Sequence, residues 1–172
     1  RPETDLVVLI AISFLLGQRP SDMAQLAVKD VQIRDTCLVI TIKRGKVIEH
    51  IGPYVVALPR TPRLARYSEA LVHLCSTRDD TMYLFSRDNT VAEREELTRG
   101  IALILKDFDL GVRSVRRGGL QAMATAGIAL PTILKFSQHA TVPMLMRYLQ
   151  HGAAATAHID EMLQCVEQTI RT

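Results

Sequence analysis

Residues 15–26 have the sequence LLGQRPSDMAQL, which marks the end of one helix and the start of another. Gly17 can adopt the positive φ that ends a helix, and Pro20 suits the first turn of a helix because a first-turn N–H has no partner within the helix. We therefore expect a second short helix from Ser21 to about Ala27. Arg19 should lie at its entrance.

The segment before this turn is apolar. Thr4 is a good N-cap, and we expect a helix from this residue through Leu16. The apolar run 6–16 is too short to span a bilayer, and the acidic Glu3 and Asp5 do not fit a signal peptide. The run therefore predicts a buried helix, and we expect no membrane partner.

Two runs rich in β-branched residues follow, at Cys37–Lys43 and Val47–Leu58. Arg44-Gly45-Lys46 separates them, which predicts a hairpin with a glycine turn. Lys43 and Lys46 would then flank its tip.

The spacing of apolar residues predicts that the rest of the chain is mostly helical, apart from a short extended piece at 82–85. Apolar residues recur at helical spacing in two sets, Leu64, Tyr67, Leu71 and Leu74, then Leu97, Ile101, Ile104 and Leu105. Later helices are expected at Arg113–Ala126, Pro131–Gln138, Val142–Gln150 and from about Ala154. The predicted fold class is mainly α with a small antiparallel β-sheet (α+β), in a single domain over 1–172.

Charge is distributed unevenly along the chain. Its 172 residues, 48% of them hydrophobic, suffice for one globular domain, and the net charge of +3 is too small to identify a partner. Residues 77–110 hold eight acidic and five basic residues, whereas residues 111–159 contain no Asp or Glu. The bases of the acid-free stretch are Arg113, Arg116, Arg117, Lys135 and Arg147. We expect this stretch to face an anion.

Three cysteines, Cys37, Cys75 and Cys165, lie far apart and form no zinc-binding or disulfide pattern. We expect a reducing compartment, and neither a metal nor another cofactor. The chain begins at Arg1 without a methionine, from which we expect a fragment of a longer protein.

The segment around Arg19 resembles the first arginine box of tyrosine recombinases, in which a Gly-x-Arg turn precedes a Ser-Glu-Leu helix. Asp22 stands where the family usually has Glu. Lys43 follows Arg19 by 24 residues and matches the family's catalytic lysine, with Lys46 as the alternative.

Residues 113–119, RSVRRGG, resemble the family's His-x-x-Arg box, with Arg116 as the second catalytic arginine. Arg113 stands where the family has histidine. His139 follows Arg116 by 23 residues, and Tyr148 follows His139 by nine, both as in the family. The Arg-Arg-Gly-Gly sequence is also similar to recombinases of DIRS-like retroelements and cryptons, which are eukaryotic mobile elements.

The resemblance implies the tyrosine-recombinase catalytic-domain fold and cleavage and rejoining of one DNA strand through a 3′-phosphotyrosine at Tyr148. Arg19 and Arg116 would grip the phosphate, because a guanidinium binds two phosphate oxygens at once and stays protonated. Lys43 would protonate the leaving 5′ oxygen. His139 would bond a phosphate oxygen or orient the tyrosine.

Arg113 cannot accept the tyrosine proton as a neutral histidine can, so we expect it to add positive charge at the phosphate. His139 or water would then be the base.

The implied partner is double-stranded DNA, with a homotetramer on paired sites and a monomer as the alternative for this fragment. DNA contacts are expected from five basic residues, Arg44, Lys46, Arg117, Lys135 and Arg147. The family's N-terminal helical domain has no counterpart within 1–172. Residues 154–172 are expected to form a helix that is exchanged between subunits or packs on its own core. The location would be the nucleus in a eukaryote and the cytoplasm in a bacterium.

Three alternatives stay open. The chain could be a recombinase-derived DNA-binding domain without activity, which the missing histidine at Arg113 favours. It could be a type IB topoisomerase, which shares the chemistry. A helical adaptor with no nucleic-acid role would require the acid-free stretch to be coincidental.

Overall fold

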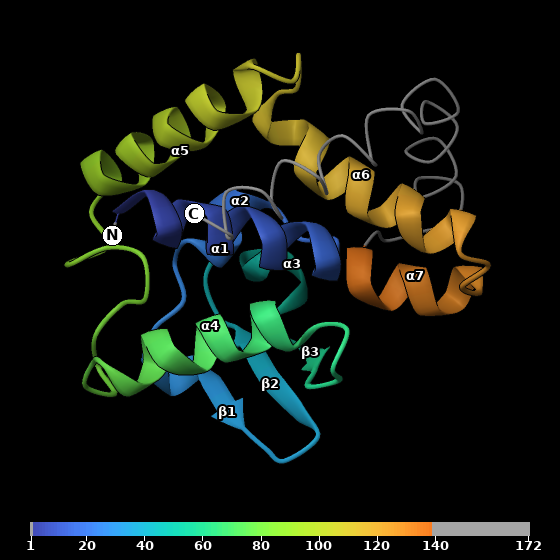
Figure 1. Cartoon of the computed structure of the whole chain (residues 1–172), viewed down its shortest axis with the longest axis horizontal. Helices are drawn as coiled ribbons and strands as arrows, with labels where there is room; N and C mark the ends of the chain where they lie inside the picture. The colour runs from blue at the N-terminus through green and yellow to red at the C-terminus, as the bar shows by residue number, and fades with distance from the viewer. Residues whose placement is uncertain (1, 139–172) are drawn as a thin grey trace.

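The computed structural model describes residues 2–138, which form helices and a small antiparallel sheet at one edge of the molecule (Figure 1). The helices are α1 (Pro2–Leu16), α2 (Pro20–Met23), α3 (Ile48–Ile51), α4 (Ala65–Ser76), α5 (Val91–Lys106), α6 (Val112–Thr125) and α7 (Leu130–Ser137), with a 3-10 turn η1 (Val28–Asp30). The strands are β1 (Val31–Ile33), β2 (Cys37–Ile42) and β3 (Tyr54–Pro59). The expected α+β class is confirmed.

Helix α1 lies at the centre of the molecule. Its residues 7–12 are all buried, as expected for a helix that is apolar on every side. It contacts α5 and α6 on one side, and α4 and β3 on the other (Figure 1). Among residues 2–138, no helix has both the length and the apolar character needed to cross a membrane.

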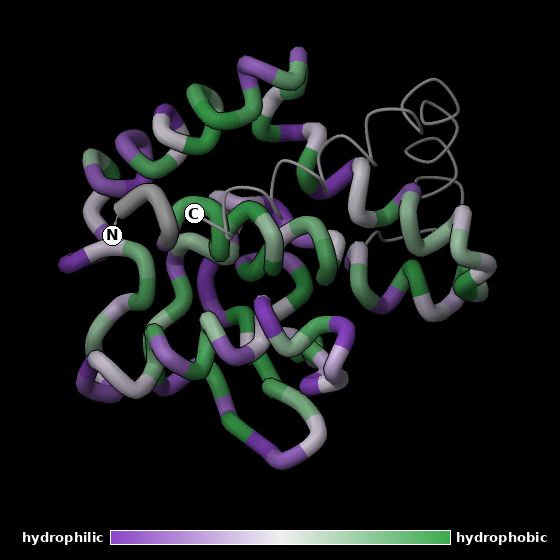
Figure 2. The backbone as a smooth tube through the Cα atoms, viewed as in Figure 1, coloured by the Kyte–Doolittle hydropathy of each residue, from purple (hydrophilic) through white to green (hydrophobic). Residues whose placement is uncertain are grey.

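The sheet has the order β1-β2-β3, and both pairs are antiparallel. Cys37 pairs with Pro59 and Ile42 with Tyr54, so the two predicted strand runs do pair. The inward residues of β2 alternate with half-buried ones, which is the burial pattern of a sheet with one face on the core. In Figure 2 the turn between β1 and β2 is hydrophilic, whereas both strands are largely hydrophobic. The sequence pattern did not predict β1.

The predicted glycine turn at Arg44-Gly45-Lys46 is wrong, although the two strands pair. Helix α3 interrupts the predicted strand Val47–Leu58, and β3 begins only at Tyr54. Gly52 ends α3 with φ +76, and Pro53 has no N–H to donate to a strand ladder. The segment 43–53 is therefore a longer connection between β2 and β3.

A glycine motif ends α1. The N–H of Gly17 bonds to the carbonyl of Phe14 at 3.1 Å, and that of Gln18 bonds to the carbonyl of Ser13 at 2.8 Å. This is the Schellman pattern, and Gly17 supplies the left-handed residue with φ +63. The turn directs the chain into Arg19, as the sequence predicted.

Helix α6 packs very closely on the end of α1. A Cβ atom on Gly119 would lie 2.0 Å from the carbonyl oxygen of Phe14 and 3.2 Å from the Cα of Gly17. Only glycine fits there, which explains why a residue of poor helix propensity stands inside α6. Gly119 therefore lets α6 bring its arginines to the end of α1.

Several element boundaries differ from those expected. Helix α1 begins at Pro2 instead of Thr4, and α2 ends at Met23 instead of near Ala27. Tyr83 forms an isolated bridge with Ala27, so the extended piece expected at 82–85 is confirmed only at this residue. The helices expected in 64–74, 97–105, 113–126 and 131–138 are also confirmed as α4 to α7. Those expected at 142–150 and from 154 lie outside the described residues.

Candidate active site

Five basic residues line one cleft of about 400 Å³. They come from the α1–α2 turn, from the segment between β2 and β3, and from α6. The lining residues are Arg19, Pro20, Ser21, Lys46, Val112, Arg113, Arg116 and Arg117. No acidic residue is among the described residues that line the cleft. The three arginines predicted for the site, Arg19, Arg113 and Arg116, therefore line one cleft with Lys46, the alternative lysine.

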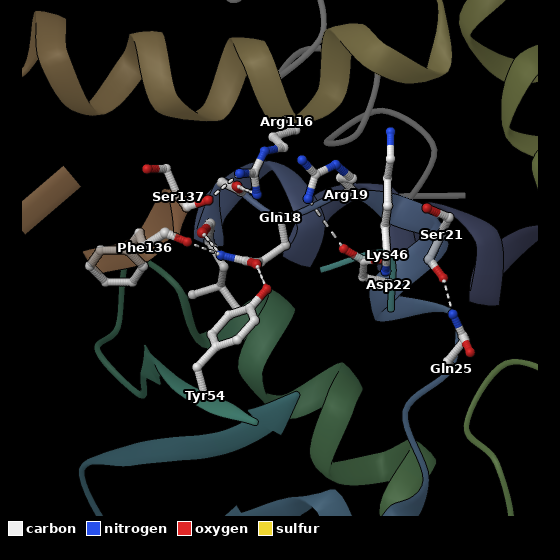
Figure 3. A network of polar contacts seen from close by, with 12 residues as sticks. Gln18, Arg19, Ser21, Asp22, Gln25, Lys46, Tyr54, Arg116, Phe136 and Ser137 are labelled. Carbon is white, nitrogen blue, oxygen red and sulfur yellow. Dashed lines mark hydrogen bonds and ion pairs between the residues drawn. The ribbon is translucent and has the colours of Figure 1, made fainter. Parts of the chain in front are cut away.

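Arg116 is buried, with 2% of its surface exposed, and connects two helix ends. Its guanidinium donates to the carbonyl of Gly17 at 3.1 Å and also to the carbonyl of Ser137. The last carbonyls of a helix have no partner within the helix and carry partial negative charge, so a cation is stabilised there. These bonds fix the direction of the guanidinium at the inner wall of the cleft (Figure 3).

Arg19 lies at the entrance of α2, as predicted, with extended backbone angles of φ −70 and ψ 130. Its side chain is 30% exposed, and its Nη1 lies 3.6 Å from Oδ2 of Asp22. Arg19 can therefore meet a ligand from solvent while one carboxylate restrains it. In Figure 3 the side chains of Arg19 and Lys46 both extend toward α6.

Asp22 also holds the segment that carries Lys46. Its Oδ1 accepts the backbone N–H of Lys46 at 3.2 Å, and Asp22 is 3% exposed. Gly45 packs against the same carboxylate, since a Cβ atom there would lie 2.6 Å from Oδ1. One buried acid thus connects Arg19 to the lysine segment.

Of the two candidate lysines, Lys46 lines the cleft and Lys43 does not. The Lys43 Nζ lies 3.3 Å from Oδ1 of Asp30, a buried carboxylate that also accepts from Arg44 at 2.8 Å and from the Ala27 N–H at 2.9 Å. Burial disfavours the charged form of Asp30, but the Ala27 N–H and the two cations outweigh it and lower its pKa. Lys43 and Arg44 thus help to neutralise a core carboxylate.

The predicted DNA-contacting residues are placed unevenly. Arg117 and Lys46 line the cleft, whereas Lys135 is exposed on α7 and does not. Arg44 also donates to the carbonyl of Gln25 at 3.0 Å and lies 5.5 Å from the ring centre of Tyr83. Its guanidinium is therefore used within the fold.

A buried polar network lies behind the cleft, and sequence reasoning did not find it. The Gln18 amide nitrogen donates to the carbonyls of Leu16 at 2.8 Å and Phe136 at 2.7 Å, and its oxygen accepts from the Tyr54 hydroxyl at 2.7 Å (Figure 3). The signal for this network in the sequence was a polar residue, Gln18, between Gly17 and Arg19.

The phenol of Tyr54 is a donor and not a nucleophile in this arrangement. Burial, and then the nearby charge of Asp22, raise its pKa to about 12, although Arg116 and Arg19 oppose the shift. The hydroxyl therefore stays protonated at neutral pH.

His139, Tyr148 and Arg147 lie outside the described residues. The last described helix, α7, ends at Ser137, whose carbonyl accepts from Arg116. Position 139 thus follows closely on the residue that contacts the second arginine. Within residues 2–138, no cluster of three or more His, Cys, Asp or Glu side chains could hold a metal ion. Comparison with known proteins found no matching family model and no matching curated protein.

Proposed function

We propose that this chain binds double-stranded DNA and breaks and rejoins one strand through a 3′-phosphotyrosine at Tyr148, as the catalytic domain of a tyrosine recombinase. One observation carries the proposal. Arg19 and Arg116, from separate sequence boxes, line one basic cleft together with Lys46. A binding site for the scissile phosphate needs this arrangement of cations.

The chemistry explains why the cleft needs guanidinium groups. In cleavage, the Tyr148 hydroxyl gives its proton to a base, His139 or water, and its oxygen forms a bond to phosphorus. The bond from phosphorus to the 5′ oxygen breaks, and that oxygen takes up a proton from the lysine general acid. The transition state carries extra negative charge on the non-bridging oxygens, and preorganised cations stabilise it. Rejoining reverses these steps with a 5′ hydroxyl as the nucleophile, so the reaction needs no ATP.

The position of Lys46 makes it the better candidate for the general acid. Its backbone is anchored on Asp22 while its side chain lines the cleft, so the ammonium group can reach a leaving oxygen. Lys43 is held at Asp30 instead. Arg113, exposed at the rim of the cleft, adds positive charge near the phosphate.

A second candidate function is DNA binding without cleavage, in a domain derived from a recombinase. The observation that favours it is Arg113, which lines the cleft where the family has a histidine and cannot accept a proton. Binding to the phosphate backbone would persist, and the covalent step would be lost.

A nicked DNA substrate that traps the covalent intermediate distinguishes these functions. Wild-type protein should form a denaturant-resistant adduct, and Tyr148→Phe should form none, whereas Tyr83→Phe serves as the matched control and should react like wild type. Arg19→Ala should slow adduct formation by roughly 10²-fold. DNA binding without any adduct would favour the second candidate and reject cleavage.

A further inference from the structure

We propose that Gln18 is a positioning residue that, with Tyr54, holds the end of α7 and the guanidinium of Arg116 in place beside Arg19. The inference rests on the proposed function, because it assigns Gln18 a role in the same cleft. The hydrogen-bond partners of the Gln18 side chain, Leu16, Phe136 and Tyr54, do not line the cleft, so Gln18 would act through its neighbours.

Gln18 and Arg116 bridge the same two helix ends in parallel. The Gln18 amide joins the carbonyls of Leu16 and Phe136, and Arg116 joins those of the next residues along each helix end, Gly17 and Ser137. The two side chains thus form adjacent bridges between α1 and α7. Both bridges need the same distance between the ends of α1 and α7, so a change in that distance would weaken both.

Apolar packing alone does not direct the last carbonyls of α7. Ile133 lies in a small cluster with Leu120 and Met123 of α6, and Phe136 packs against both this cluster and the main core around α1. The bonds from Gln18 and Arg116 add a directional restraint between the carbonyls of Phe136 and Ser137 and the end of α1. If the Gln18 bridge is lost, Arg116 has to supply this directional restraint alone, and the direction of its guanidinium is less well fixed.

Tyr54 extends the network to the lysine segment. It is the first residue of β3, and the segment 43–53 that carries Lys46 leads directly into it. Its hydroxyl donates to Gln18 Oε1, so both amide hydrogens of Gln18 remain directed at the helix carbonyls. Gln18 thus connects the turn of Arg19, the strand after Lys46 and the helix end beside Arg116.

The test compares Gln18→Met and Tyr54→Phe, both close in shape to the native residue, with Ser13→Ala as the matched control. Ser13 is equally buried, and within residues 2–138 its hydroxyl donates only to the carbonyl of Leu9 in its own helix. Gln18→Met should slow single-turnover cleavage roughly 10- to 100-fold. The Kd for DNA should change by less than about threefold, because contacts with phosphates along the DNA backbone dominate the affinity.

Tyr54→Phe should slow cleavage less, and the double variant should be no slower than Gln18→Met alone, because Tyr54 acts through Gln18. Ser13→Ala should cleave at the wild-type rate. Equal losses in Ser13→Ala and Gln18→Met, or additive losses in the double variant, would overturn the assignment.

Two readouts do not depend on cleavage. In Gln18→Met, backbone hydrogen exchange should rise in 130–138 and not in 65–76, and the affinity of the cleft for inorganic phosphate should fall several-fold. If the wild-type protein forms no adduct, the proposed function fails. The hydrogen exchange and the phosphate affinity still test whether Gln18 positions Arg116. Unchanged exchange at the end of α7 together with unchanged phosphate affinity would refute this positioning role.

Discussion

Gly119→Ala tests the close approach of α6 to α1 on which the position of Arg116 depends. The new Cβ atom would lie 2.0 Å from the carbonyl oxygen of Phe14, whereas a carbon and an oxygen in contact are about 3.3 Å apart. The obstacle is backbone, so α6 has to move away by more than about 1 Å. Overpacking of this kind costs ~3 kcal/mol, and the higher helix propensity of alanine returns ~1 kcal/mol. We therefore expect a net loss of roughly 2 kcal/mol.

Gly100→Ala is the matched control, because Gly100 also lies inside a helix. Its Cβ atom would meet Cδ1 of Leu6 at 2.7 Å, the far end of a flexible side chain that can rotate away. The gain in helix propensity should offset this contact, so stability should stay within about 1 kcal/mol of wild type. Urea unfolding followed by circular dichroism measures both variants. Equal stability of Gly119→Ala and wild type would refute the packing argument.

Three further predictions concern single side chains. Asp30→Asn should lower the free energy of unfolding by about 3 kcal/mol at pH 7, because two cations lose a buried partner. Since folding lowers the pKa of Asp30, its contribution is present above the usual pKa and lost as pH falls through the lowered value, so urea titrations of variant and wild type should converge in acid. Gln121→Leu should raise the unfolding free energy by ~1 kcal/mol or more in the same assay, because neither end of this buried amide has a partner within residues 2–138; a loss would show that the amide is satisfied. Lys46→Ala should slow cleavage of the trapping substrate more than Lys43→Ala, and the reverse order would return the acid role to Lys43.

Much of the fold could be predicted because hydrophobic periodicity is local. The apolar run of α1 indicated a buried helix, and Gly17 indicated where it ends. Helix α3 was missed because Val47, Ile48 and Ile51 favour strands by composition, while the signal against a strand was confined to Gly52 and Pro53. Local propensity alone could not show that residues 48–51 form a helix before the chain pairs with β2 as β3.

The sequence predicted which residue types line the site. It predicted less well which lysine takes part and which residues hold the site's side chains in place. Spacing indicated that Arg19 and Arg116 act together, and they line the same cleft. Spacing also favoured Lys43 over Lys46, but the choice depends on which ammonium group the buried Asp30 attracts, and this is set by tertiary contacts. The bonds from Gln18 to Phe136 and Tyr54 join residues far apart in the chain, so no local pattern reveals them.

Membership of the recombinase family stays a prediction, and the site of the covalent bond tests it most directly. The trapped protein–DNA adduct should be digested, and the peptide that carries the 3′ phosphate identified by mass spectrometry. We expect the phosphate on the oxygen of Tyr148 and on no other residue. A phosphate on Tyr54, or a protein that binds DNA and never becomes linked to it, would rule out Tyr148 as the nucleophile.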